Sequence, residues 1–135
     1  MDEPVSSLYV HVPFCARKCT YCAFYSEASE AEWMDRYVHA LVRELEQVAA
    51  DLRPRTIFFG GGTPTLLTVR HWDQIFRALD RLGLLGAEEF TVEANPATIS
   101  AEKARVLRLH GVNRISLGVQ SFDPAVLELL GRIHT

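Results

Sequence analysis

The chain has 135 residues, 48% hydrophobic and 23% charged, so it can bury a core as one domain or as part of one. Its net charge of −3 gives no sign of binding to nucleic acid or to an anionic membrane surface. The apolar runs are too short for a membrane span, and the acidic N-terminus does not resemble a signal peptide. The three cysteines are clustered, which argues against a disulfide framework and favours a reducing, cytoplasmic compartment.

Short apolar or alternating segments bounded by turn-forming residues predict four strands, at residues 8–12, 56–59, 90–94 and 114–120. The first helix is predicted to begin at Ser29, the start of a capping box, and to end near Leu52, before Arg53-Pro54. The later helices have N-cap candidates at Thr68, Ser100 and Asp123, with Gly83 or Gly86 ending the second and Gly111 the third.

Apolar residues at helical spacing predict which helix faces are buried. The first stripe comprises Trp33, Tyr37, Leu41, Leu45 and Val48, and the second contains Trp72, Ile75, Phe76, Leu79 and Leu82. Both tryptophans are therefore expected in the core. Three histidines are expected at helix surfaces or caps: His39, His71 and His110.

Strand and helix alternate, which predicts an α/β fold with a parallel sheet covered by helices and connected by right-handed crossovers. A closed (β/α)8 barrel needs about 250 residues, so four units cannot close one. The fourth strand would be an open edge that a fifth strand should cover. We therefore expect residues 1–135 to be the N-terminal part of one core domain of a longer protein, without a second domain.

The predicted strands are apolar on one face and polar on the other, unlike strands buried on both sides. Tyr9 and His11 share one face of the first strand, and Glu93 and Gln120 occupy the polar faces of the third and fourth. A carboxylate inside a sheet is unfavourable without a polar partner. The polar faces therefore predict a wet or ligand-filled interior.

Cys15, Cys19 and Cys22 form a C-x3-C-x2-C pattern with no fourth cysteine. Three thiolates at this spacing favour a [4Fe–4S] cluster that has one iron without a protein ligand. The alternatives are incidental cysteines or a zinc site with His11 as fourth ligand. Arg17 and Lys18 lie inside this loop, where cations would lower thiolate pKa values and offset the cluster charge, or would be solvated.

Gly60-Gly61-Gly62-Thr63 follows the second strand and permits close backbone approach to a ligand, although a tight turn would use the same residues. Glu93, at the end of the third strand, is suited to ribose hydroxyls or to an edge ion pair. Gln120 and Arg132 have weaker claims and are more often structural or solvated.

These motifs resemble those of radical S-adenosylmethionine (SAM) enzymes. The segments at 9–15, 59–65, 93–96 and 116–122 are similar to the oxygen-independent coproporphyrinogen III oxidase group. The resemblance covers nearly all of the chain from Leu8 onward and implies four consecutive βα units of an open, TIM-like barrel. It implies that Cys15, Cys19 and Cys22 bind the cluster and that SAM chelates the fourth iron. The SAM-contacting positions would be Tyr9, Tyr21, Gly61, Gly62, Thr63, Glu93, Gln120 and Arg132.

Two branches of that group differ after the third cysteine. The porphyrinogen-oxidising branch has a further cysteine at the position of Phe24, so Phe24 resembles the heme chaperone branch. That resemblance implies heme delivery to an acceptor protein, at the membrane or elsewhere, with an electron donor for the cluster. The heme-binding residues would lie C-terminal to Thr135. Porphyrinogen oxidation in porphyrin biosynthesis and a simple iron–sulfur or zinc module remain the alternatives, and the sequence leaves open whether the protein is an enzyme.

Overall fold

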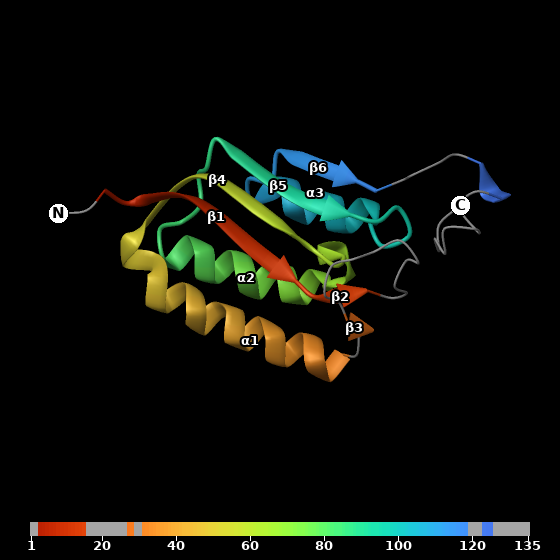
Figure 1. The fold of residues 1–135 in the computed structure, drawn as a ribbon, viewed down its shortest axis with the longest axis horizontal. Helices are drawn as coiled ribbons and strands as arrows, with labels where there is room; N and C mark the ends of the chain where they lie inside the picture. Colours follow the sequence, from red (N-terminus) through yellow and green to blue (C-terminus); the bar gives the residue numbers. More distant parts are fainter. Residues whose placement is uncertain (1–2, 16–26, 29–30, 119–122, 126–135) are drawn as a thin grey trace.

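The structure is a computed structural model that describes residues 3–15, 27–28, 31–118 and 123–125. Its main sheet has four parallel strands in the order β1-β4-β5-β6 (Figure 1). They are β1 (Val5–Val12), β4 (Leu52–Gly61), β5 (Glu89–Ala94) and β6 (Arg114–Leu117). The predicted parallel α/β sheet is confirmed, with β1 and β4 longer than expected.

Three helices lie on one face of this sheet: α1 (Ala31–Val48), α2 (Val69–Arg81) and α3 (Ala101–Leu109) (Figure 1). Single 3-10 turns, η1 (Ala49–Asp51) and η2 (Pro64–Leu66), precede and follow β4. A two-residue parallel pair, β2 (Phe14–Cys15) with β3 (Glu27–Ala28), flanks the cysteine segment and was not predicted. In the described part of the chain, no helix covers the opposite face of the main sheet.

The ends of α2 follow the sequence signals. Thr68 accepts a hydrogen bond from the His71 backbone N–H, and the His71 ring accepts one from the Thr68 N–H, which completes a capping box. At the other end Gly83 adopts φ +71°, and the Leu84 N–H donates to the Leu79 carbonyl. This is a Schellman ending, for which glycine is favoured because a left-handed residue is required. Ser100 likewise caps α3.

The predicted end of the first helix is wrong. Helix α1 stops at Val48, and Leu52 already belongs to β4. Pro54 lies inside β4, where the pairing with β1 shifts between Val5 and Ser7. Because proline lacks an N–H, it is tolerated at such an irregularity and does not have to end the preceding helix there.

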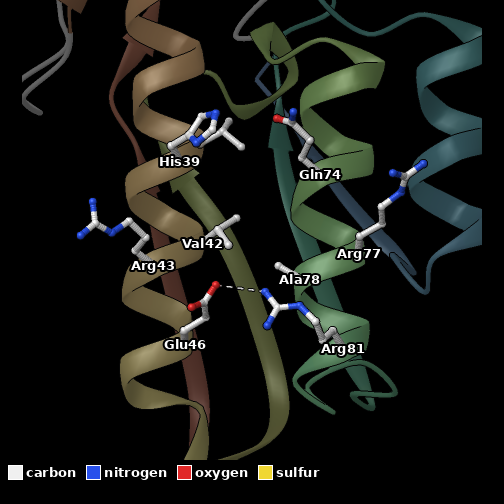
Figure 2. Close-up of a pocket in the computed structure, with 9 residues that line it drawn as sticks. His39, Val42, Arg43, Glu46, Gln74, Arg77, Ala78 and Arg81 are labelled. Atoms are coloured by element: carbon white, nitrogen blue, oxygen red, sulfur yellow. Dashed lines mark hydrogen bonds and ion pairs between the residues drawn. The ribbon is translucent and has the colours of Figure 1, made fainter.

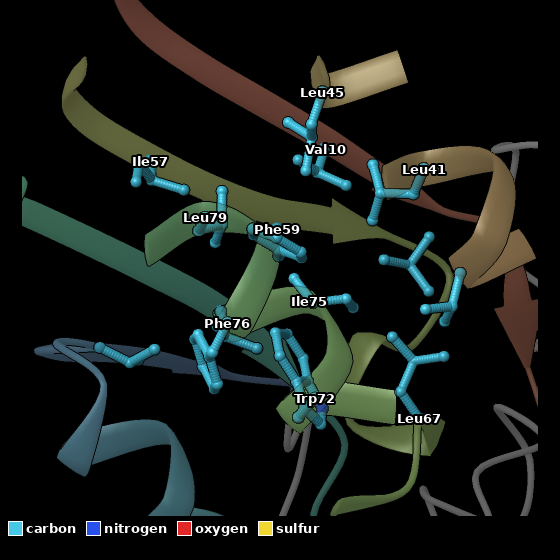
Figure 3. Packing of buried hydrophobic residues seen from close by; sticks show 14 of the residues in the cluster. Val10, Leu41, Leu45, Ile57, Phe59, Leu67, Trp72, Ile75, Phe76 and Leu79 are labelled. Carbon is cyan, nitrogen blue, oxygen red and sulfur yellow. The ribbon is translucent and has the colours of Figure 1, made fainter. Parts of the chain in front are cut away.

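The core fills the space between the sheet and its helices (Figure 3). Phe59 of β4 and Phe90 of β5 stack with centroids 5.7 Å apart, and Trp72 of α2 packs against Phe59 at 5.2 Å. Each of these side chains is at most 1% exposed. Full burial of one large apolar side chain stabilises a fold by roughly 1.5–3 kcal/mol. The predicted core position of Trp72 is confirmed.

The expected core position of Trp33 is wrong. Trp33 is 49% exposed, and the Arg36 guanidinium lies 4.9 Å from its ring centroid. The face that packs on the sheet lies one residue further along α1 and consists of Met34, Val38, Leu41 and Leu45. A stripe that advances by four residues drifts around an α-helix, because each turn takes 3.6 residues. The predicted stripe therefore faces the core at Leu41 and Leu45 but not at Trp33, and Val48, the last residue of α1, is 39% exposed.

Strand β6 ends at Leu117, three residues before the predicted end, and Gly118 is not part of it. Ile115 and Leu117 are 40% and 46% exposed, since β6 is an edge of the described sheet. The Asp123 carboxylate accepts a hydrogen bond from the Ala125 N–H, as expected of an N-cap. The remainder of the predicted fourth helix lies outside the described residues, as does Ser29.

Candidate functional site

A row of side chains crosses the helix-free face of the sheet near the carboxyl ends of its strands. His11 of β1 pairs with Gly60 of β4, and Glu93 of β5 pairs with Ser116 of β6. Gly60 lies directly beside the Glu93 side chain. A Cβ at position 60 would collide with the Glu93 carboxylate oxygen Oε1 and lie 2.7 Å from a Phe58 ring carbon. The lack of a side chain at Gly60 therefore makes room for the Glu93 carboxylate.

Gly61, the last residue of β4, lies against the His11 ring. Its φ of +106° is disfavoured for residues with a Cβ, and a Cβ here would lie 2.5 Å from two atoms of the His11 ring. The Gly61 backbone forms a hydrogen bond with the Glu93 carboxylate, which lowers the Glu93 pKa, as does the charge of nearby His11. Burial outweighs both effects and raises the pKa of Glu93 above its usual value.

Tyr9 lies one step back along β1 on the same face. Its ring stacks on Phe58 at 5.8 Å, and its hydroxyl lies 3.2 Å from the His11 Nδ1 atom. Burial, and then the charge of Glu93, raise the pKa of Tyr9, so its hydroxyl stays protonated at neutral pH. Tyr9, His11 and Glu93 thus offer a phenol, an imidazole and a carboxylate on one open surface.

The glycine-rich loop holds the segment that carries Cys15. The Gly62 N–H donates to the Val12 carbonyl and the Thr63 N–H donates to the Phe14 carbonyl, both at 2.7 Å. A Cβ at Gly62 would lie 2.5 Å from the Phe14 carbonyl oxygen, so the two segments touch along their backbones. Because these two N–H groups already donate hydrogen bonds within the chain, a ligand would have to contact other atoms of the loop.

Cys15 is a free, half-buried cysteine at the end of β2. The Thr63 hydroxyl donates a 3.9 Å hydrogen bond to its sulfur. Hydrogen bonds of this kind stabilise a thiolate that ligates iron. Tyr37 of α1 holds the chain segment that precedes Cys15. Its hydroxyl donates to the His11 carbonyl at 2.7 Å, and its ring packs edge-on against Phe14.

Six of the predicted site residues are described, and all belong to β1, to the ends of β2, β4 and β5 or to the loop after β4. They are Tyr9, Cys15, Gly61, Gly62, Thr63 and Glu93. The other predicted positions lie outside the described residues: Cys19, Tyr21, Cys22, Gln120 and Arg132. Within the described part of the chain no group of three or more metal-binding side chains gathers, as expected when two of the three cysteines are not included.

Gly60 was missed as a site residue, although it shapes the position of Glu93. The register between β4 and β5 could have identified Gly60, because a glycine beside a polar position on the neighbouring strand leaves room for that polar side chain. The sequence placed His11 on the polar face of β1 and suggested it only as a zinc ligand. The structure places it between Tyr9 and Gly61.

A groove of about 400 Å³ between α1 and α2 is a weaker candidate. Val42 and Ala78 lie at its centre, and an ion pair between Glu46 and Arg81, 3.1 Å apart, spans it (Figure 2). The guanidinium groups of Arg43 and Arg77 point away from the groove on either side (Figure 2). The charges do not converge on a common ligand position, so this surface carries no site.

The comparisons with known proteins agree with the fold and the motifs. The model of the radical SAM superfamily matches residues 9–135, and the chain belongs to that superfamily. It is 42% identical to the heme chaperone HemW of Lactococcus lactis subsp. lactis (strain IL1403), covering 100% of this chain and 36% of the relative. It is 44% identical to the heme chaperone HemW of Escherichia coli (strain K12), covering 97% and 36%.

Porphyrin-processing proteins are similar as well. The oxygen-independent coproporphyrinogen III oxidase of Bradyrhizobium diazoefficiens is 38% identical, with coverage of 96% of this chain and 30% of that protein. The solved coproporphyrinogen III oxidase HemN from Escherichia coli, a radical SAM enzyme, superposes with a TM-score of 0.88 at 31% identity, covering 98% of this chain and 32% of that chain. The predicted TIM-like fold is therefore confirmed, with the sheet open. The chain spans about a third of the length of these relatives.

Proposed function

We propose that this chain binds a [4Fe–4S] cluster through Cys15, Cys19 and Cys22 and binds SAM at the open iron. The observation that carries the proposal is the convergence of Tyr9, Glu93 and the loop 60–63 beside Cys15. A half-buried free thiol that accepts a hydroxyl hydrogen bond fits a cluster ligand. A bound cluster would supply the electron that cleaves SAM reductively, which is chemistry of the cofactor and not of the side chains.

In this proposal the chain's own groups position SAM. Glu93 holds the ribose or the region around the sulfonium, because its carboxylate is fixed by Gly61 and faces the open side of the sheet. Tyr9 stays a neutral hydrogen-bond donor beside it. Gly61 to Thr63 meet the methionine end, and the undescribed Tyr21, Gln120 and Arg132 complete the contacts. A cation facing a desolvated carboxylate would compensate the energy of its burial.

We further propose that the protein is a heme chaperone that delivers heme to an acceptor protein and works in the cytoplasm with an electron donor. The support is the identity of 42–44% to two proteins named HemW, together with Phe24 at the position where the oxidising branch has a cysteine. None of the described helices is long and apolar enough to cross a membrane. In this proposal, association with a membrane takes place through a partner.

Coproporphyrinogen oxidation is the second candidate, because the HemN structure matches the fold closely. The test uses the full-length protein, reconstituted anaerobically with iron and sulfide, reduced with dithionite and supplied with SAM. One assay adds coproporphyrinogen III, and a second adds heme and an acceptor protein. The chaperone proposal predicts heme transfer to an acceptor without porphyrinogen turnover. Formation of the decarboxylated porphyrin product would reject it, and the yield of 5′-deoxyadenosine would show independently whether SAM is cleaved.

A further inference from the structure

Lys103 occupies an unusual place for a lysine. It is the third residue of α3, where its backbone N–H donates to the capping Ser100 hydroxyl at 3.1 Å. A cation is unfavourable at a helix N-terminus, because the helix dipole is positive there. The side chain is also half-buried, and this desolvation lowers its pKa. None of the ion pairs between described residues involves it.

The Lys103 ammonium group joins two loops at the same edge of the sheet. It donates to the Thr65 carbonyl oxygen in a close contact and to the Thr98 carbonyl oxygen at 3.0 Å. Thr65 lies in the η2 turn directly after the glycine-rich loop, and Thr98 lies in the turn after β5. The two threonine hydroxyls are 2.6 Å apart, and the Asn95 N–H donates to the Thr65 hydroxyl at 3.4 Å.

These two loops directly follow β4 and β5, which carry Gly61 and Glu93 of the proposed cofactor site. The glycine-rich loop begins at Gly60 and passes Cys15 before reaching Thr65, and Glu93 is two residues before Asn95. A displacement of either loop would change the position of the Glu93 carboxylate relative to Gly61 and Thr63. The contact of Glu93 with Gly60 leaves little tolerance for such a displacement.

We propose that Lys103 is a positioning residue for the SAM site, which locks the loop after β4 to the turn after β5. This inference rests on the proposed function. A lysine with only a structural role would be expected at a solvated position or beside a carboxylate. The Lys103 ammonium group is instead desolvated, and it belongs to the N-terminal turn of α3, where the helix dipole disfavours a cation. Local rules of this kind are most often broken where a functional site requires it.

The test compares Lys103→Met with Arg105→Met, which removes the same charge from an exposed position in the same helix. In the cluster-loaded protein, Lys103→Met should weaken SAM binding about tenfold at unchanged iron and sulfide content, because a charge-assisted link is lost. Arg105→Met should bind SAM as the wild type does. Lys103→Arg should recover part of the affinity, since it restores a cationic donor.

Hydrogen–deuterium exchange on the cofactor-free protein gives a second readout. Lys103→Met should accelerate exchange in residues 60–66 and 95–98, while exchange in the centre of α2 stays as in the wild type. Thr98→Ala, which removes the hydroxyl link but keeps the ammonium, should have a smaller effect in the same segments. It also serves as the test variant if Lys103→Met does not fold.

The outcomes separate this inference from the proposed function. If the wild-type protein does not bind SAM, the proposed function fails. If the wild type binds SAM and Lys103→Met binds it within twofold of the wild type, the positioning role is overturned. Uniformly faster exchange together with a general loss of thermal stability would also overturn it, in favour of a purely structural role.

Discussion

Glu93 illustrates how a carboxylate that is unfavourable for folding can still suit a binding site. Burial raises its pKa although the Gly61 backbone and His11 act in the opposite direction. A carboxyl whose folded pKa is raised binds more protons in the native state than in the unfolded chain. The stability of the cofactor-free protein should therefore fall as pH rises above the usual glutamate range and through the raised pKa of Glu93.

Glu93→Gln should separate the two roles of this residue. The cofactor-free variant should be as stable as the wild type or more stable at pH 7, because the desolvated charge is gone. Its SAM affinity should drop by about tenfold or more, since a hydrogen bond to a charged acceptor is lost. Thermal unfolding at several pH values and equilibrium binding of SAM measure the two effects. Glu89→Gln, in the same strand, is the control and should leave SAM binding unchanged.

Gly61 and Gly86 offer a matched pair for the close packing at the site. Both have a positive φ, so alanine at either position should cost about 1–2 kcal/mol from the backbone alone. Only at Gly61 would the new Cβ also meet the His11 ring, whereas the Cβ at Gly86 would meet nothing within 4 Å. Urea unfolding should therefore show a larger loss for Gly61→Ala than for Gly86→Ala. Equal losses would mean that His11 moves aside freely.

At the scale of elements, α1 and α2 are tied together by a polar link over their apolar contact. The buried His71 ring lies 2.6 Å from the Asp35 carboxylate through Nε2, and Arg70 donates to the same oxygen at 3.0 Å. The hydrogen bond from His71, followed by the charge of Arg70, holds the Asp35 pKa below its ordinary value. Because the His71 Nδ1 atom accepts the Thr68 N–H, the capping box fixes the direction of this link.

Asp35→Asn should therefore reduce stability in a pH-dependent way. A lowered folded pKa gives stability that is present above the usual aspartate range and is lost as pH falls through the folded value. The difference in Tm between wild type and variant should be largest near pH 6 and shrink toward pH 3. Asp80→Asn, at an exposed position of α2, is the control. A difference that stays constant with pH would show that the carboxylate charge is not involved.

The two tryptophans should differ strongly when they are truncated. Trp72→Ala removes a fully buried ring packed on Phe59 and should cost about 3–5 kcal/mol. Trp33→Ala removes a half-exposed ring and should cost less than about 1 kcal/mol. Denaturant unfolding of both variants checks this, and a comparable loss for Trp33→Ala would contradict the observed orientation of α1.

Element order and type could be predicted because the apolar periodicity and the caps agree, as at Thr68, Ser100 and Gly83. The position of α1 around its own axis could not, since Trp33 and Met34 both continue an apolar stripe and only packing on β1 and β4 selects between them. The end of α1 was missed because Pro54 was assumed to terminate a helix. The pairing irregularity that admits it is a tertiary property.

For the whole molecule, strand alternation predicted the open polar face that carries Tyr9, His11 and Glu93, and the structure confirms that they lie together. The role of Gly60 could not be read from the loop motif, because it depends on the register between β4 and β5. The link through Lys103 joins residues far apart in the chain and has no local sequence pattern. That residues 1–135 form one part of a core domain stays a prediction.

The sheet itself explains why site and fold belong together. The described helices cover one face, so the apolar core residues of β1, β4 and β5 are buried there. Tyr9, Phe58 and Glu93 lie on the open side. Because the strands are parallel, their carboxyl ends bring the loop after β4, the end of β5 and Cys15 to one edge. This arrangement requires the backbone contacts of Gly62 and Thr63 with the segment from Val12 to Phe14.

The most direct test of the central claim is the EPR spectrum of the reconstituted, dithionite-reduced protein, recorded with and without SAM. We predict about four irons and four sulfides per chain and the signal of a reduced [4Fe–4S] cluster, which changes when SAM is added because SAM binds the open iron. Cys15→Ala should lose the signal. Zinc in place of iron, or a cluster signal that SAM leaves unchanged, would contradict the account.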